Sequence, residues 1–95
     1  MREIVLDGSR WISSKDVYDS FLTAVGAPNW HGHNFNALRD SIGVGGINSI
    51  EVPYKVRIKN FSLIGAGAKR MADGFAQLIG ELRDSGCPVD IQIDD

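Results

Sequence analysis

Residues 30–43 read Trp-His-Gly-His-Asn-Phe-Asn-Ala-Leu-Arg-Asp-Ser-Ile-Gly, and this stretch predicts a short helix behind an aromatic loop. Asn34 suits the N-cap, because its side-chain oxygen can accept a hydrogen bond from an otherwise unpaired backbone N–H. Apolar residues then recur at the helical period and form one stripe that faces a core: Phe35, Leu38 and Ile42. Gly43 is expected to end the helix.

The other side of this helix is polar. Asn36 and Asp40 are four residues apart and are therefore neighbours on one face, and His33 precedes Asn36 by three residues. Before the helix, Trp30 lies close to a flexible glycine, Gly32. This pattern is typical of a recognition surface, but every amphipathic helix has a polar face, so the pattern alone leaves both interpretations open.

The composition indicates one soluble domain over residues 1–95. The formal net charge is -2, so the chain lacks the basic excess that is usual in nucleic-acid binders. No segment has the length and hydrophobicity of a membrane span, and residues 1–20 show no signal-peptide pattern. Cys87 is the single cysteine, so no internal disulfide can form. A cytoplasmic location is the natural expectation.

The rest of the chain predicts three strands and two further helices. Strands are expected over residues 2–7, 52–59 and 89–94, because apolar and polar residues alternate there. A helix is expected to begin at Ser13, with Asp16 completing a capping box, and a longer helix is expected over residues 68–84. Residues 60–66 are expected to form a loop with a partial helical turn.

This order of elements predicts an α/β fold. Strands joined by helical crossovers are normally parallel, and the crossovers are right-handed. Alternating strands imply one covered face and one wet face, so all helices lie on one side and the strand order is 1-2-3. Charges on the wet face agree with this order, because basic residues of the middle strand face acidic residues of its neighbours: Lys55, Arg57 and Lys59 against Glu3, Asp90 and Asp94.

Several patterns invite a catalytic or metal-binding interpretation, but none is specific. The glycines at 43, 45 and 46 follow a helix rather than a strand, so a connector is favoured over a phosphate-binding loop. His31 and His33 offer two imidazoles to a metal, against the simpler interpretation that both face solvent. Ser41 beside Asp40 does not define a triad. For Cys87 a packed thiol is favoured. We therefore predict no enzymatic activity, cofactor or metal.

The segment from Trp30 to Asp40 closely resembles the central motif of the barstar family, which is named after a small intracellular inhibitor of the bacterial ribonuclease barnase. That motif contains an aromatic pair, Gly, a variable residue, Asn, an apolar residue, Asp, Ala, Leu, Trp and Asp. The similarity continues along nearly the whole chain, at residues that match the family in order and position: Asp7, Gly8, Pro28, Pro53, Phe75, Glu81, Gly86 and Cys87.

The resemblance implies a barstar-like fold in which the second helix and its preceding loop enter a nuclease active site. Asp40 then corresponds to the principal acidic residue that meets the basic catalytic groups, in place of an RNA phosphate. Glu81 corresponds to a peripheral acidic contact. The residues expected at the partner interface are Trp30, His31, Gly32, Asn34, Asn36, Arg39, Asp40, Gly43, Val44 and Glu81.

Two positions depart from the motif: Asn36 replaces an aspartate and Arg39 replaces a tryptophan. Because charge complementarity governs partner choice, these changes favour a toxin other than barnase. The resemblance thus predicts a monomeric immunity protein that forms a 1:1 complex with a bacterial ribonuclease toxin and occludes its active site. The alternative is a module of the same fold that serves protein interaction or regulation without a nuclease partner.

Overall fold

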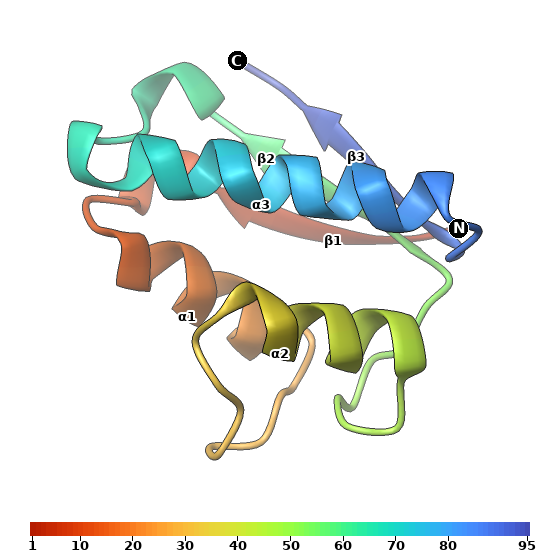
Figure 1. Ribbon diagram of the computed structural model, residues 1–95. Coiled ribbons are helices and arrows are strands. Elements are labelled where there is room, and N and C mark those ends of the chain that lie inside the picture. Colours follow the sequence, from red (N-terminus) through yellow and green to blue (C-terminus); the bar gives the residue numbers. More distant parts are fainter.

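The computed structural model describes residues 1–95 and has two layers, a sheet and the helices that cover one of its faces (Figure 1). The helices and strands follow one another along the chain as β1 (Arg2–Asp7), α1 (Ser14–Ala24), α2 (Phe35–Arg39), β2 (Tyr54–Lys59), α3 (Ala66–Asp84) and β3 (Val89–Ile93). The three strands are parallel and follow the order β1-β2-β3. The predicted fold class and strand order are therefore confirmed.

The covered face of the sheet carries its apolar residues in register. Leu6 of β1 lies opposite Ile58 of β2, and Ile4 lies opposite Val56. All four side chains are buried, whereas Val5, between them, points to the open face and is exposed. A period of two thus separates the core side of the sheet from its wet side, as the alternation in the sequence predicts.

On the open face, basic side chains of β2 pair with acidic side chains on both neighbouring strands. The Lys55 ammonium lies 3.3 Å from a Glu3 carboxylate oxygen, and the Arg57 guanidinium forms an ion pair with Asp94. The predicted flanking of these basic residues by Glu3, Asp90 and Asp94 is confirmed by the register of the strands. Asp90 lies opposite Lys55 in register, but its carboxylate accepts instead from Arg83 at 3.0 Å, because the end of α3 passes close to β3.

The helices supply the remainder of the core. Val17 and Phe21 of α1 pack under Phe75 of α3, and the two phenylalanine rings lie 5.1 Å apart between centroids. In α3 the stripe of Phe75, Leu78 and Ile79 is buried as predicted. The helix begins at Ala66, two residues before the predicted start. None of the helices combines the length and the apolar character needed to cross a bilayer.

Two connections between the regular elements also pack around the core. The partial helical turn predicted within residues 60–66 is confirmed as a 3-10 turn, Phe61–Leu63. Trp11, in the link between β1 and α1, is almost completely buried and is one of the largest core side chains, although nothing in its local sequence pattern predicts this. The core therefore reaches beyond the regular elements.

Candidate protein-binding surface

The helix α2 presents two faces of opposite character, as the sequence predicts. Asn34 caps it, since the side-chain oxygen accepts a hydrogen bond from the Ala37 backbone N–H at 2.8 Å. Leu38 is 0% exposed and anchors the inner face in the core. Asn36 and Asp40 are exposed on the outer face. Phe35 differs from the expectation of a buried stripe, because it is only half-buried and lies against Gly74 of α3.

The end of α2 differs from the prediction. Gly43 does not stop the helix. The chain continues through a wider, π-helical turn, Asp40–Val44, in which the Gly45 N–H donates to the Asp40 carbonyl at 3.1 Å. Gly45 has a φ of 83° and so breaks the helix at a conformation that favours glycine. The extra turn extends the outer face and leaves Val44 at its end, 84% exposed.

Two loops flank α2 and project away from α3 and the sheet (Figure 1). They are joined to each other by backbone hydrogen bonds: Ser49 N–H donates to the Gly26 carbonyl at 3.2 Å, and Ile50 N–H donates to the Val25 carbonyl at 2.9 Å. Gly26 has a φ of 66°, and a Cβ there would lie 2.7 Å from the Ser49 Cβ. The entry and the exit of the α2 region are therefore fixed side by side.

The first of these loops carries Trp30, His31 and His33, and these three aromatic side chains differ in exposure and direction. Trp30 is 74% exposed, whereas His31 is only 5% exposed, so the interpretation of both histidines as solvent-facing is wrong for His31. A turn in which His31 N–H donates to the Pro28 carbonyl directs it inward. Its Nδ1–H donates to the Gly32 carbonyl at 2.8 Å, which leaves Nε2 as a buried acceptor without a partner.

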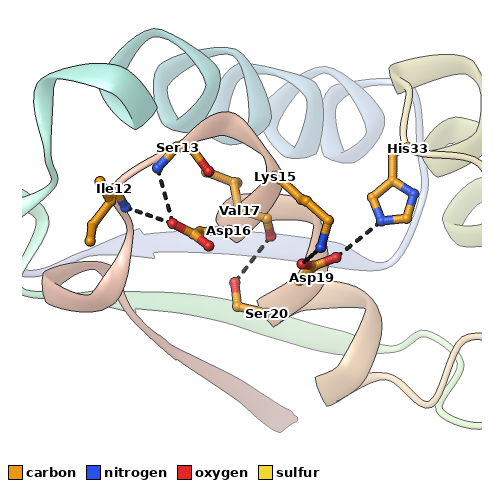
Figure 2. A network of polar contacts seen from close by, with 8 residues as sticks. All are labelled: Ile12, Ser13, Lys15, Asp16, Val17, Asp19, Ser20 and His33. Atoms are coloured by element: carbon orange, nitrogen blue, oxygen red, sulfur yellow. Dashed lines mark hydrogen bonds and ion pairs between the residues drawn. The ribbon is translucent and has the colours of Figure 1, made fainter.

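His33 is exposed and points to α1 instead of joining His31. Figure 2 shows the His33 Nε2 beside Asp19, 3.1 Å from Oδ1 of a carboxylate that also binds Lys15. The hydrogen bond from Lys15, followed by that from His33, lowers the pKa of Asp19. The ring of His33 also packs edge-on against Tyr18, with centroids 5.5 Å apart. His33 thereby ties the start of α2 to α1.

The same helix α1 is fixed at its own start by an acidic cap (Figure 2). The Asp16 carboxylate accepts hydrogen bonds from the backbone N–H groups of Ile12 at 2.8 Å and Ser13 at 3.0 Å, which confirms the predicted role of Asp16. These backbone donors lower the pKa of Asp16. These hydrogen bonds hold the start of α1, the helix that His33 contacts through Asp19.

The charged groups of the outer surface are not equivalent. Arg39 Nη2 lies 3.3 Å from Glu81 Oε2, and Gln77 donates to the other oxygen of Glu81 at 3.2 Å. Asp40 has neither an ion pair nor a hydrogen bond to its carboxylate. Every other acidic side chain except Asp95 has at least one such partner. Asp40 is therefore an uncompensated carboxylate on a well-anchored helix.

Most of the predicted interface residues are exposed, either on α2 and the segments that flank it or on the facing part of α3. Trp30, Asn36, Arg39, Asp40 and Val44 are exposed around α2, and Glu81 reaches them from α3. Asn34 and Gly43 are also exposed and Gly32 is half-buried. We call the set Trp30, Asn36, Arg39, Asp40, Val44 and Glu81 the α2 surface.

Sequence reasoning missed two supporting residues of this region. Gln77, one turn before Glu81 on α3, holds its carboxylate, and the i,i+4 spacing of the two is a recognisable pattern. Glu51 accepts from the Gly46 N–H at 3.0 Å and fixes the glycine turn.

The geometry does not support a catalytic role for Ser41, because its hydroxyl is buried and donates to the Leu38 carbonyl. No cluster of three or more His, Cys, Asp or Glu side chains is arranged to hold a metal ion.

Comparison with known proteins agrees with the motif between Trp30 and Asp40. A family model described as "Barstar (barnase inhibitor)" matches residues 1–92. No curated protein matches the chain. The family match covers all helices, the α2 surface and the three strands except for Ile93, the last residue of β3.

Proposed function

The chain belongs to the barstar family, and on that premise we propose that it inhibits a bacterial ribonuclease toxin by covering the toxin's active site with residues 30–43. In this proposal it is an immunity protein of the bacterial cytoplasm that binds as a monomer in a 1:1 complex. Its role is binding and not catalysis. The family match supports the class of partner, and the geometry of the α2 surface supports the mode of binding.

The single observation that carries the proposal is the uncompensated carboxylate of Asp40. A ribonuclease active site holds basic groups that attract the phosphates of RNA, and a carboxylate on a projecting helix can take the place of one phosphate. Leu38 and Ile42 hold the helix from behind, so the carboxylate is already placed before binding. Such preorganisation reduces the entropy lost on association.

The exposed apolar residues at both ends of α2 fit the same role. Trp30 precedes the helix and Val44 follows it, and both are largely exposed in the free protein. Aromatic anchors are enriched among the residues that dominate protein interfaces. Contact of Trp30 and Val44 with a partner would exclude water around Asp40 and strengthen its electrostatic attraction to a buried cation.

The test compares two acidic residues. Asp40→Ala should weaken binding of the ribonuclease encoded beside the gene by at least about 30-fold, because an interface cation would be left buried and unpaired. The matched control is Asp73→Ala on α3, whose carboxylate already pairs with Lys69 at 3.1 Å outside the α2 surface. Asp73→Ala should change the affinity by less than about threefold.

Isothermal titration calorimetry measures both affinities. Equal affinities for Asp40→Ala and Asp73→Ala would contradict the site. Recovery of no nuclease in a co-expression pull-down would instead favour the alternative role, a protein-interaction module without a nuclease partner.

A further inference from the structure

Arg39 is the one cation of the α2 surface, and it is engaged within the molecule. It ends α2, and its guanidinium crosses to α3 to meet Glu81 at 3.3 Å. Both side chains are about half exposed, at 46% and 52%. Gln77 holds the second oxygen of Glu81, so the carboxylate is bound from two sides. The contact is a small network and not an isolated surface pair.

The position of this network directs the Arg39 side chain across the space between α2 and α3. A cleft of about 180 Å³ lies between α2 and α3, lined by Phe35, Arg39, Gly74, Gln77, Leu78 and Glu81. Gly74 allows α2 and α3 to approach closely at this point, because a Cβ there would lie only 2.9 Å from the Phe35 ring. The Arg39 side chain bridges this cleft. Its guanidinium is directed towards α3 and forms its ion pair with Glu81.

The pairing changes the charge that a partner meets. Arg39 and Glu81 together contribute no net charge, so Asp40 alone supplies the negative potential of the α2 surface. A surface with one carboxylate between the exposed apolar residues Trp30 and Val44 is complementary to a recessed single cation with an apolar rim. It is poorly complementary to a wide cleft lined by several basic groups.

We infer that Arg39 is a specificity-determining residue that neutralises Glu81 and so selects a partner with a single recessed cation over a broadly basic one. The inference rests on the proposed function and names the class of nuclease surface that the site accepts. Arg39 acts through Glu81 and not through contact with an acidic group of the partner. Removing its charge should therefore increase the rate at which the protein associates with a strongly basic ribonuclease.

The experiment uses barnase as the basic probe and measures association and dissociation rates by stopped flow at low and high salt. Arg39→Gln frees Glu81 and should raise the association rate roughly two- to fivefold at low salt. Glu81→Gln should lower the rate by a similar factor, and the double variant should return to the wild-type rate. All differences should shrink when salt reduces the Debye length to about 3 Å.

The kinetic outcomes separate the possible roles of Arg39. Faster dissociation of Arg39→Gln with unchanged association would make Arg39 a direct contact and overturn the inference. No gain of binding over wild type, including no binding by either protein, would also overturn it. Loss of binding in Asp40→Ala tests the proposed function separately, so the proposed function can hold while the role of Arg39 fails.

The ion pair itself can be tested without a partner. NMR of the Arg39 side-chain N–H groups in the free protein should show a shift in Glu81→Gln and none in Asp73→Asn, which leaves the network intact. An unchanged Arg39 resonance in Glu81→Gln would show that the two groups do not interact in solution and would overturn the inference.

Discussion

The open face of the sheet and the α2 surface both expose charged side chains to water, but their carboxylates have different surroundings. On the sheet, Glu3 pairs with Lys55 and Asp94 pairs with Arg57. On α2, Asp40 has no counter-charge within the molecule, while Trp30 beside the helix exposes apolar surface. The carboxylates of Glu3 and Asp94 are thus paired within the molecule, and the carboxylate of Asp40 is not.

Under the proposed function, this difference separates charges that stabilise the fold from a charge that is used in binding. Ion pairs between exposed side chains contribute modestly to stability, and opposite charges across neighbouring strands favour the observed register. Asp40 contributes nothing comparable to the fold. The comparison therefore predicts that stability and binding respond to different residues, and three changes test it, the largest first.

Leu38→Ala should cause the largest loss of stability, because it removes the buried side chain that packs α2 against the core. Leu38 is fully buried, and removal of such a side chain costs about 2–5 kcal/mol of unfolding free energy. Val44→Ala, at the exposed end of the same region, should change stability by less than about 0.5 kcal/mol. Urea unfolding followed by circular dichroism measures both. Similar losses would show that the inner and outer faces are not distinct.

Gly26→Ala should have an intermediate effect, because it strikes the junction of the two loops that frame the α2 surface. Both a positive φ and a contact with Ser49 oppose the added methyl group, and we expect a loss of about 1–3 kcal/mol. The matched control is Gly46→Ala, which has a φ of 83° but no atom within 4 Å of the new Cβ.

The difference between the two alanine variants isolates the contact from the backbone strain. Thermal unfolding of both proteins gives that difference. If Gly46→Ala destabilises the protein as much as Gly26→Ala does, the loop junction contributes nothing specific.

Acid should have the smallest and most diffuse effect, because the carboxylates with a lowered pKa lie both on α1 and along the sheet. Hydrogen bonds from Asn60 and Ser9 lower the pKa of Asp7 to about 2, and Gln92 and Arg57 lower the pKa of Asp94. A lowered pKa in the folded state stabilises the protein above the unfolded value, about 3.9. That contribution is lost as the pH falls through the native pKa.

The unfolding midpoint in urea should therefore fall between pH 4 and about pH 2. Asp7→Asn should reduce the size of this fall, because the variant has no carboxylate to protonate at that position. A midpoint that is constant from pH 5 to about pH 2, or a fall that is unchanged in Asp7→Asn, would contradict the assignment.

Much of the fold follows from the sequence because local pattern and global topology agree. The alternation of Tyr54, Val56 and Ile58 with basic residues requires a sheet with one wet face. This requirement, together with right-handed crossovers, leaves a single order for three parallel strands. The cap at Asn34 and the inner position of Leu38 are equally local, and the structure contains both.

The remainder depends on contacts between distant residues. Gly43 was a plausible stop, but the positive φ occurs at Gly45, where Glu51 supports the turn from across the loop. His31 is buried by a turn whose direction the sequence does not specify. The pairing of Arg39 with Glu81 requires the packing of α2 beside α3, which no periodicity reveals. The chemical character of the surface was predictable, but its charge balance was not.

The hydrogen bonds between residues 25–26 and 49–50 close the intervening segment into a ring whose two ends meet on the scaffold. Such a closed excursion separates two tasks within one short chain. Under the proposed function, substitutions within residues 27–48 could change the surface that meets the partner, while the strands keep their pairing. The segment between these hydrogen bonds can therefore vary in sequence without changing the sheet that supports it.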